Sequence, residues 1–474
     1  MDNYIKDRFS VASAASLSVG EDDKYRFTAA DLVRGRYGDK TPLAYVHTYG
    51  CQGNVSDSEY LKGMLRDAGF GFCSSPADAD LVLFNTCAVR EHAQDRVFGN
   101  IGALKPLKEK NRSLIIIVCG CMTQQPGVVE KISKSYDFVD IVFGTGVMKK
   151  FYGFLCRALS GYKVRETAGP GSTVEEGVPT FRDRDFKVWL PVMYGCDNFC
   201  SYCIVPYVRG RERSREPGRV LEDARSLVSG GAKDITLLGQ NVNSYGKGLS
   251  DPIGFPELLS LVCAVEGDFR VRFMTSHPKD CSTALLESMA SNPKAAKHLH
   301  LPVQSGSNRI LRLMNRGYDR ERYLSLIREA RSMMPDLSIT SDIIVGFPGE
   351  TEEDFQDTLS LVEEVGFTSL YTFIYSPRSG TRAAKMPDPV THEEKAERMK
   401  RLCSLQESIA RSRSVTYVGK RFRVLAEKWS GGRIEGRAEG NYIISFPGDE
   451  SEIGSYTDVE VTSAGNYTLE GKAV

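Results

Sequence analysis

Three closely spaced cysteines constrain this chain more than any other feature of its sequence. Cys196, Cys200 and Cys203 lie in the stretch YGCDNFCSYC, with the spacing CxxxCxxC. Cysteine thiolates are the usual ligands of a four-iron, four-sulfur (4Fe-4S) cluster, and three of them leave one of the four irons open. An open metal position is where chemistry occurs. The alternative, a zinc knuckle, needs a second Cys or Cys/His pair within about 12–20 residues, whereas the next cysteine is Cys263.

The size and composition of the chain set the broad class. A length of 474 residues predicts two to four domains. Its 41% hydrophobic and 26% charged residues are ordinary for a globular protein, and no apolar run approaches the roughly 20 residues that span a bilayer. The start of the chain is not a convincing signal peptide. We therefore expect a cytoplasmic protein without membrane contact, whose 12 cysteines are thiols or metal ligands rather than disulfides.

Residues 41–160 alternate short apolar strands with amphipathic helices, which predicts a doubly wound parallel sheet. We expect 1–40 to be an extension that is either disordered or strapped onto a neighbouring domain. The stretch 161–181, rich in Gly, Pro, Thr and Glu, is predicted to be a linker. The predicted strands are 43–48, 81–85, 114–118 and 139–143, and the predicted helices are 57–68, 91–104 and 126–134.

A cysteine follows each of the first three predicted strands. Cys51, Cys87 and Cys121 all fall just past the carboxyl ends of parallel strands, where open α/β sheets place ligands. Nearby glycines let the backbone approach a bulky inorganic group. One such cysteine would be read as a small buried hydrophobe, but three at equivalent positions predict a shared ligand. Cys119, which ends its strand, is expected to point into the core.

A second strand–helix alternation over 182–412 fits a partial (β/α)6 barrel, with the CxxxCxxC loop after its first strand. Strands are predicted at 187–193, 234–239, 270–275, 298–303, 338–345 and 369–375, and helices at 217–230, 279–290, 319–333 and 351–366. Polar residues lie at or near the strand ends, where barrel enzymes carry their chemistry: Gln240, Asn241, Ser276, His277, Gln304, Ser305, Ser341 and Asp342. Each alone fits a loop hydrogen-bonder or cap equally well, and we expect His277 to cap a turn rather than transfer protons.

Two basic segments are candidates for an RNA contact. Because the formal net charge is zero, any nucleic-acid site must be a local patch. Arg209, Arg211, Arg213 and Arg215 follow the cysteine loop, where the alternative is a solvated surface paired with neighbouring glutamates. After a predicted helix over 392–414, residues 413–474 change to short strands with glycine-containing turns, which predicts a small all-β barrel. Its basic residues come early, and they include the candidate RNA contacts Arg421 and Arg423.

The string GCDNFCSYCIVPYVRGRERSR resembles the radical S-adenosylmethionine (SAM) methylthiotransferase family. RGRERSR, LLGQNVNSYG and RFMTSHPKD are similar to its MiaB-type branch, and the resemblance covers about 43–474. It implies a flavodoxin-like N-terminal domain with a second 4Fe-4S cluster on Cys51, Cys87 and Cys121, a radical SAM barrel, and a C-terminal TRAM domain. The family usually reads CQMN where this chain reads CQGN; we expect the cluster to survive this change at Gly53. The SAM contacts implied are Tyr202, Gln240, Asn241, Ser276, Gln304, Ser341 and Asp342.

The resemblance also implies the reaction. SAM chelates the open iron and is cleaved to a 5′-deoxyadenosyl radical, while a second SAM methylates a sulfur held by the second cluster. The product is 2-methylthio-N6-isopentenyladenosine at position 37 of the tRNA anticodon loop, whose base must leave its stack. We expect a monomer, an electron donor of flavodoxin or ferredoxin type, a sulfur or cluster donor protein, and no catalytic side chain beyond the cluster ligands.

Three alternatives stay open at this point. One is a methylthiotransferase for threonylcarbamoyladenosine in tRNA, and another is a non-catalytic RNA-binding iron–sulfur protein. The third, a plain electron carrier, explains neither the barrel nor the C-terminal module. Cleavage of SAM under reducing conditions separates the enzymes from the non-catalytic alternatives.

Overall fold

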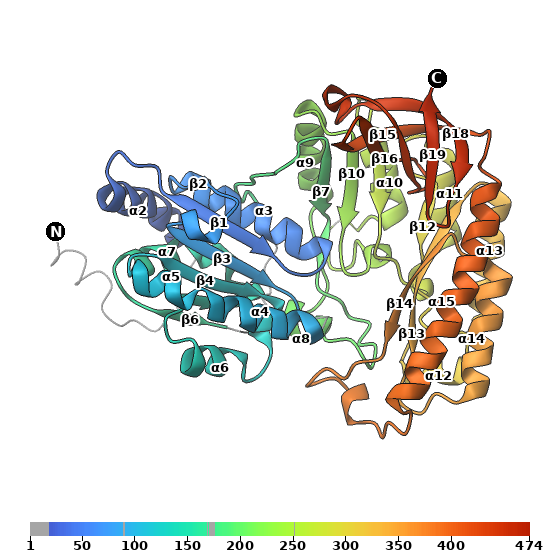
Figure 1. Ribbon diagram of the computed structural model, residues 1–474, viewed down its shortest axis with the longest axis horizontal. Helices are drawn as coiled ribbons and strands as arrows, with labels where there is room; N and C mark the ends of the chain where they lie inside the picture. Colours follow the sequence, from blue (N-terminus) through green and yellow to red (C-terminus); the bar gives the residue numbers. More distant parts are fainter. Residues whose placement is uncertain (1–18, 89–90, 168, 170–175, 251) are drawn as a thin grey trace. The chain divides into compact units, whose positions relative to one another are not determined.

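The computed structural model describes residues 19–88, 91–167, 169, 176–250 and 252–474 (Figure 1). Its contacts divide the chain into two compact units. Unit 1 comprises Met1–Asp183, Tyr194–Asp197 and Cys203–Arg213, and unit 2 comprises Arg184–Met193, Asn198–Tyr202 and Ser214–Val474. The division runs through the CxxxCxxC loop. In the described ranges, none of the helices is long and apolar enough to cross a membrane.

Unit 1 is built on one parallel sheet with the strand order β2-β1-β3-β4-β5-β6 (Figure 1). The first five strands follow the flavodoxin-like order 2-1-3-4-5, as the sequence predicted. The strands are β1 (Leu43–Thr48), β2 (Gly71–Phe72), β3 (Leu81–Thr86), β4 (Ile115–Gly120), β5 (Ile141–Phe143) and β6 (Val164–Glu166). The helices are α2 (Val19–Tyr37), α3 (Gln52–Asp67), α4 (Glu91–Ala103), α5 (Lys105–Lys110), α6 (Val128–Ser135) and α7 (Phe151–Leu159).

Both faces of this sheet are buried, as expected for a parallel sheet covered by helices. Leu83 and Ile117 belong to one core cluster, whereas their neighbours Val82 and Ile116 belong to another. This alternation follows the period of two along a strand. The continuous apolar runs at β3 and β4 are therefore explained by helices on both sides.

Two boundary predictions are refined by unit 1. Strand β6 lies inside the predicted linker 161–181 and pairs in parallel with β5, because Val164 is apolar and buried against the core. The domain therefore continues past residue 160, while 168 and 170–175 lie outside the described residues. Helix α2 packs through Ala29 and Val33 into the same core, and Arg26 donates to Asp67 over 2.7 Å. The described part of 1–40 is thus strapped onto the domain, and 1–18 lie outside the described residues.

Unit 2 contains six parallel strands in chain order, as two three-stranded sheets, β7-β10-β11 and β12-β13-β14. A bridge between Val271 and Ala295 lies between the two sheets, consistent with the predicted partial barrel. The strands are β7 (Lys187–Pro191), β10 (Asp234–Leu238), β11 (Arg270–Phe273), β12 (His298–His300), β13 (Ser338–Val345) and β14 (Ser369–Ile374). The helices are α9 (Pro217–Ser229), α10 (Phe255–Cys263), α11 (Thr283–Ser291), α12 (Asn308–Leu313), α13 (Arg320–Met333), α14 (Glu352–Val365) and α15 (His392–Val415).

Local sequence signals fix the ends of the long helices in unit 2. Thr351 and Asp354 form a capping box at the start of α14, and Gly366 ends that helix in the left-handed conformation. A second capping box, formed by Thr391 and Glu394, starts α15. These signals explain why the sequence places both helices within a residue of their observed bounds.

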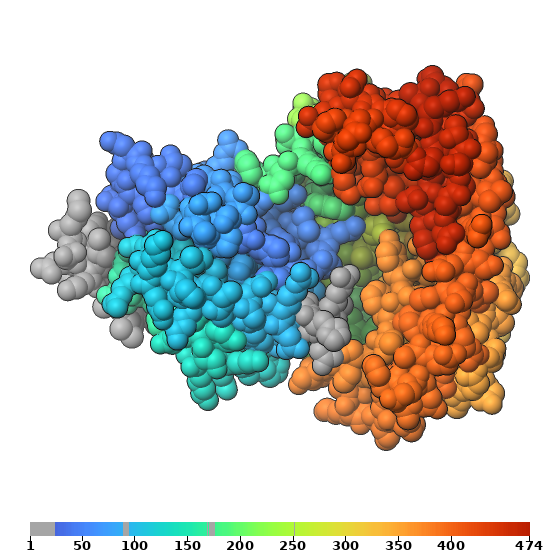
Figure 2. Space-filling view, in the orientation of Figure 1, coloured from blue at the N-terminus to red at the C-terminus, as the bar shows by residue number. Residues whose placement is uncertain are grey.

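The C-terminal residues form a closed five-stranded barrel with the order β15-β16-β17-β19-β18. Its strands are β15 (Arg421–Ser430), β16 (Arg433–Arg437), β17 (Ile443–Pro447), β18 (Tyr456–Ala464) and β19 (Thr468–Ala473). Figure 2 shows these residues, in red, packed directly against the rest of unit 2. Several of the contacts are polar. Lys187 pairs with Glu427 over 2.8 Å, and Arg272 donates to the carbonyls of Ala438 and Glu439 over 2.7 Å each.

Candidate cluster sites

The first candidate site lies at the carboxyl edge of the unit 1 sheet. Cys51 immediately precedes α3, Cys87 directly follows β3, and Cys121 directly follows β4. Because β1, β3 and β4 are neighbours in the sheet, their ends bring the three thiols together. Burial raises the pKa of the Cys121 thiol to about 12, Arg209 opposes that rise, and Cys87 and Cys51 add to it. The structure places the three cysteines where the sequence predicted.

Two glycines hold the loops of this site close together. Gly50 has a φ of +118°, and a Cβ there would lie 2.5 Å from the Cβ and 2.8 Å from the Sγ of Cys87. Gly120 has a φ of +100°, and a Cβ there would lie 2.4 Å from both Asn85 Oδ1 and the carbonyl of Thr86. Only glycine combines these backbone angles with such close approach.

A buried amide network fixes the same loops. Asn54 Nδ2 donates to Asn85 Oδ1 over 3.1 Å and to the carbonyl of Thr86 over 2.9 Å. Asn85 Nδ2 donates back to the carbonyl of Asn54 over 2.8 Å and to Ser58 Oγ over 3.0 Å. The role of these two asparagines was not predicted from the sequence, although the strings CQGN and FNTC place each within three residues of a candidate ligand.

Cys119 and Cys121 differ in their surroundings. Cys119 lies in the apolar core beneath the sheet, and burial raises the pKa of its thiol well above the usual value. Cys121 instead packs with Ile204 and Val208 from the segment after the CxxxCxxC loop. The prediction that Cys119 points into the core is confirmed.

Two of the four predicted RNA-contacting arginines are buried. Arg209 is 9% exposed, and its guanidinium donates to Cys121 Sγ over 3.1 Å and to Asp57 over 2.6 Å. Arg215 is 2% exposed and donates to the carbonyl of Pro191 over 2.9 Å. Both guanidinium groups are engaged inside the protein, and the RNA contact at these two positions stays a prediction. Arg211 has a side chain that is 70% exposed, and Arg213 is half-buried.

The second candidate site is the CxxxCxxC loop, whose parts lie in different units. In unit 1, the N–H of Cys196 donates to the carbonyl of Gly210 over 3.1 Å. In unit 2, Phe199 takes a φ of +48°, which is uncommon without glycine and marks a forced turn. Cys200 Sγ accepts a hydrogen bond of 3.2 Å from Arg316, which is 4% exposed. Sequence analysis missed Arg316, which follows α12 with no motif that marks it.

The predicted SAM contacts lie in unit 2 at or near strand ends. Gln240 and Asn241 follow β10, Ser276 follows β11, Gln304 follows β12, and Asp342 lies in β13. Tyr202 is partly buried against Ile310 and Phe347. Ser341 differs from the rest, since its hydroxyl donates to the carbonyl of Leu301 and accepts from the N–H of Val303, over 2.9 Å each. Ser341 has no exposed surface and stabilises the barrel wall through these two hydrogen bonds, and its contact with SAM stays a prediction.

Unpaired polar atoms gather at two of these strand ends. Among the described residues, Asn241 Oδ1, Ser276 Oγ and His277 Nε2 are buried without a hydrogen-bond partner. Orphaned buried polar atoms are rare in native proteins, so three near one barrel edge fit a polar ligand such as the methionyl part of SAM. His277 Nδ1 accepts from the N–H of Lys279 over 3.2 Å, and burial lowers the pKa of this histidine to about 2. It caps a turn, as predicted.

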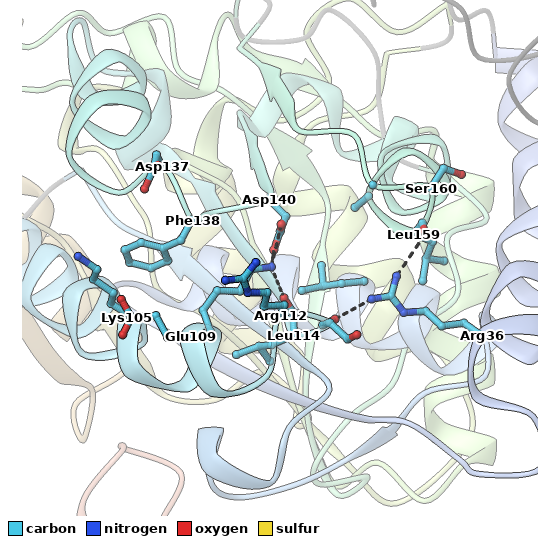
Figure 3. A pocket seen from close by; sticks show the side chains of 15 residues that line it. Arg36, Lys105, Glu109, Arg112, Leu114, Asp137, Phe138, Asp140, Leu159 and Ser160 are labelled. Carbon is cyan, nitrogen blue, oxygen red and sulfur yellow. Dashed lines mark hydrogen bonds and ion pairs between the residues drawn. The ribbon is translucent and has the colours of Figure 1, made fainter.

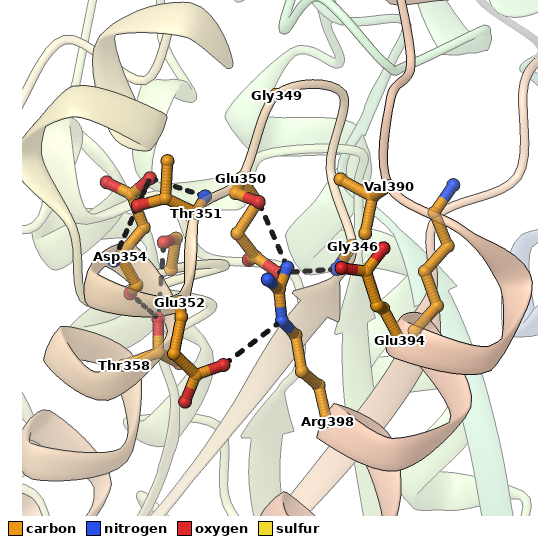
Figure 4. A network of polar contacts seen from close by, with 12 residues as sticks. Gly346, Gly349, Glu350, Thr351, Glu352, Asp354, Thr358, Val390, Glu394 and Arg398 are labelled. Carbon is orange, nitrogen blue, oxygen red and sulfur yellow. Dashed lines mark hydrogen bonds and ion pairs between the residues drawn. The ribbon is translucent and has the colours of Figure 1, made fainter.

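The GFPGE turn after β13 is clamped by α15 (Figure 4). Glu350 accepts the N–H of Gly346 over 2.8 Å, and Arg398 donates over 3.0 Å to both the carboxylate and the carbonyl of Glu350. Burial raises the pKa of Glu350 to about 7. This buried pair fixes the conformation of the turn. The resemblance to radical SAM methylthiotransferases implies that the GFPGE stretch lies near the adenine of SAM.

A cavity of about 870 Å³ in unit 1 has no cysteine in its lining (Figure 3). It lies at the amino-terminal edge of the sheet, beside Leu114 and Asp140. Some of its charged side chains are engaged within the protein: Lys108 pairs with Asp140 over 2.8 Å, and Arg36 donates to the carbonyl of Ser113 over 2.9 Å. None of the candidate ligands lines it.

The two candidate arginines of the C-terminal barrel differ in their surroundings. Arg423 donates to Asp268 over 2.6 Å and lies 4.0 Å over the ring of Tyr456, so it helps dock the barrel. Arg421 has a side chain that is 71% exposed, with Glu460 3.8 Å away. Arg421 is therefore the more accessible of the two for RNA.

The donor sets at both sites fit 4Fe-4S clusters, because each consists of thiols with adjacent N–H donors or close-packed glycines. In the described part of the chain, no three Cys, His, Asp or Glu side chains are grouped as ligands of a single metal ion.

Comparisons with known proteins cover most of the chain. Three family descriptions match: "Uncharacterized protein family UPF0004" over 43–144, "Radical SAM superfamily" over 190–362 and "TRAM domain" over 415–474. The chain is 49% identical to the "tRNA-2-methylthio-N(6)-dimethylallyladenosine synthase" of Caldicellulosiruptor saccharolyticus over 92% of this chain and 93% of that protein. It is 48% identical to the protein of the same name in Clostridium perfringens, over 91% and 98%.

A solved structure supports the fold alone. The radical S-adenosylmethionine methyltransferase TsrM from Kitasatospora setae matches with a TM-score of 0.52 and 14% identity, over 73% of this chain and 74% of that chain.

Proposed function

This chain belongs to the family of tRNA-2-methylthio-N(6)-dimethylallyladenosine synthases and is a radical SAM tRNA methylthiotransferase; we propose that its cysteines hold two 4Fe-4S clusters. One set is Cys196, Cys200 and Cys203, and the other is Cys51, Cys87 and Cys121. The names of its relatives favour N6-dimethylallyladenosine (isopentenyladenosine) in tRNA as the target over threonylcarbamoyladenosine, and we propose that this nucleoside is at position 37. When bound, the two clusters supply the electron that cleaves SAM and the sulfur that is transferred.

The observation that carries this proposal is the second thiol set. A radical generator needs only the CxxxCxxC loop, yet three further thiols gather at the carboxyl edge of another fold, with Gly50 and Gly120 holding their loops close. Replacing hydrogen on an aromatic carbon by sulfur requires both a radical and a sulfur source. The two sets match these two requirements.

The chain's own residues bind and orient the reactants. The buried, unpaired atoms of Asn241, Ser276 and His277 are available to the polar groups of SAM. Arg316 holds Cys200, and the clamped GFPGE turn gives the adenine a rigid wall. Asp342, whose pKa burial raises to about 6, lies 3.4 Å from His300 in the same barrel. We assign to these side chains the positioning of SAM, and no transfer of protons.

The partners follow from the reaction. The exposed Arg211 and Arg421 are the basic groups that we assign to the backbone of the tRNA anticodon loop. The reductant is a flavodoxin- or ferredoxin-type protein, and a separate protein donates sulfur or a cluster. We place the enzyme in the cytoplasm, with its tRNA, as a monomer.

Cysteine variants test the division of labour. Cys196→Ala, Cys200→Ala or Cys203→Ala should abolish release of 5′-deoxyadenosine after anaerobic reconstitution with dithionite. Cys51→Ala, Cys87→Ala or Cys121→Ala should bind about half the wild-type iron. They should keep SAM cleavage and lose methylthiolated nucleoside in tRNA.

Cys119→Ala is the matched control, because this neighbour of Cys121 lies in the core. It should keep all of its iron and its product. Full iron content in the Cys121→Ala variant, or wild-type SAM cleavage in the Cys200→Ala variant, would contradict the ligand assignment.

A further inference from the structure

Arg209 belongs to the segment that follows the CxxxCxxC loop, yet it contacts a thiol of the other set. It ends the short helix α8 (Val205–Arg209), which begins two residues after Cys203. Within unit 1, Val208 packs with Cys121, and the carbonyl of Val208 accepts a hydrogen bond of 2.6 Å from Thr145 Oγ1. The segment is therefore seated on the sheet domain by both apolar and polar contacts.

The guanidinium of Arg209 donates hydrogen bonds from two of its nitrogens. Its Nε donates to Cys121 Sγ over 3.1 Å, while its Nη2 donates to Asp57 Oδ2 over 2.6 Å. Nη2 also lies 3.5 Å from Asn54 Oδ1. The side chains of Arg209 and Asp57 are 9% and 7% exposed. An arginine can serve two acceptors at fixed angles, whereas a lysine carries a single point charge.

Stability alone does not explain this buried pair. Replacing a buried ion pair by apolar residues is often neutral or stabilising, so its presence is weak evidence for a role in stability. Asp57 cancels the charge of Arg209 and fixes its orientation, which aims the remaining Nε–H at the sulfur. A hydrogen bond from a charged donor is stronger and more directional than a neutral one.

We propose that Arg209 is a positioning residue for the cluster on Cys51, Cys87 and Cys121, where it donates to the Cys121 thiolate and raises the reduction potential of that cluster. The inference rests on the proposed function for its cluster. Hydrogen bonds to cluster sulfurs and nearby positive charge favour the reduced, more negative form. Helix α8 closely follows Cys203. The same few residues therefore influence the position of the end of the CxxxCxxC loop and the reduction potential of the second cluster.

The test isolates the second cluster. In full-length protein carrying Cys196→Ala, Cys200→Ala and Cys203→Ala, only that cluster remains, and its iron content, EPR spectrum and midpoint potential can be measured. Adding Arg209→Met should keep the iron but lower the potential. At the parent's midpoint, the ratio of reduced to oxidised cluster should fall about tenfold, which for one electron is about 59 mV. Arg209→Lys should give a smaller shift.

Asp57→Asn should shift the reduction potential in the direction opposite to that of Arg209→Met, which a purely structural role of the pair does not predict. It leaves the Arg209 charge uncompensated, so the potential should rise. Arg219→Met is the matched control, because its side chain is 64% exposed and paired with Glu222 on the helix surface; it should leave the potential and spectrum unchanged.

The outcomes separate the two levels of the proposal. If Arg209→Met has the same potential and EPR spectrum as the parent, the inference is overturned. If Arg209→Met takes up no cluster, the Asp57→Asn variant decides: an unchanged or lowered potential there overturns the inference. If adding Cys121→Ala to the triple variant leaves its iron content unchanged, the proposed cluster itself is overturned.

Discussion

Arg272 should hold the C-terminal barrel on the rest of unit 2, and the cost of removing it can be worked from its contacts. Its side chain is 5% exposed; Nε donates to Asp234 over 2.8 Å, and the two terminal nitrogens donate to backbone carbonyls of the C-terminal barrel over 2.7 Å. Arg272→Met leaves the Asp234 carboxylate, 1% exposed, with Arg270 at 3.9 Å. The substitution also removes the two hydrogen bonds that reach the C-terminal barrel. Hydrogen bonds from a charged group contribute about 1.5–3 kcal/mol each, so docking should weaken by about 3–6 kcal/mol.

That energy predicts how often the barrel undocks. At roughly 1.4 kcal/mol for each factor of ten, the undocked population should rise about 10²- to 10⁴-fold. Undocking exposes the connection between α15 and β15, so limited proteolysis there should accelerate by the same factor when opening is fast relative to cleavage. SAM cleavage without tRNA should persist, while tRNA affinity falls.

A double variant and a surface control test this explanation further. Asp234→Asn combined with Arg272→Met should recover part of the loss, because the uncompensated carboxylate is then gone. Arg328→Met removes an exposed arginine 3.9 Å from Glu364 and should change proteolysis little. A cleavage rate in Arg272→Met equal to that of the wild type would refute the reasoning.

Three other outcomes follow from the same structure. Arg316→Met should retain the iron of both clusters but slow 5′-deoxyadenosine release about tenfold or more, since Cys200 loses a charged hydrogen-bond donor; wild-type release would contradict this. Arg398→Met should destabilise the protein more at pH 8.5 than at pH 6, because burial raises the pKa of Glu350 to about 7 and loss of its partner raises it further, so the uncompensated charge exists only above that pH. Melting temperatures at the two pH values check this, and equal deficits would count against it. Arg421→Glu should weaken tRNA binding and reduce its salt slope by about 0.7–0.9 if Arg421 contacts one phosphate, and affinities at two salt concentrations would reveal an unchanged slope.

Local patterns explain why much of the fold was predictable. The periods of strand and helix, together with capping residues such as Thr351 and Thr391, located most elements of both units within a few residues. The equivalent position of cysteines after neighbouring strands predicted the thiol site, because strand ends in a parallel sheet share an edge. Strand β6 was missed because its short run VRE carries too little apolar pattern to distinguish it from a linker.

The residues that hold the cysteines were not predictable from local sequence. Arg209 is 88 positions from Cys121, and Arg316 is 116 positions from Cys200. An arginine beside glycine and glutamate looks like solvated surface until the fold buries it against a thiol. The same reason made Arg209 and Arg215 look like RNA contacts, since charge alone carries no information about which side chains the tertiary structure engages.

The division of the chain has a consequence for how such an enzyme can be taken apart. The contacts assign Cys196 and Cys203 to one compact unit and Cys200 to the other. A chimera of two relatives joined at Asp183 would take all three thiols of the CxxxCxxC loop from one parent. Its segments 194–197 and 203–213, however, would belong to a compact unit whose sheet comes from the other parent. The contacts of Arg209 with Cys121 and Asp57 would then join residues from two parents, so these residues have to match across such a junction.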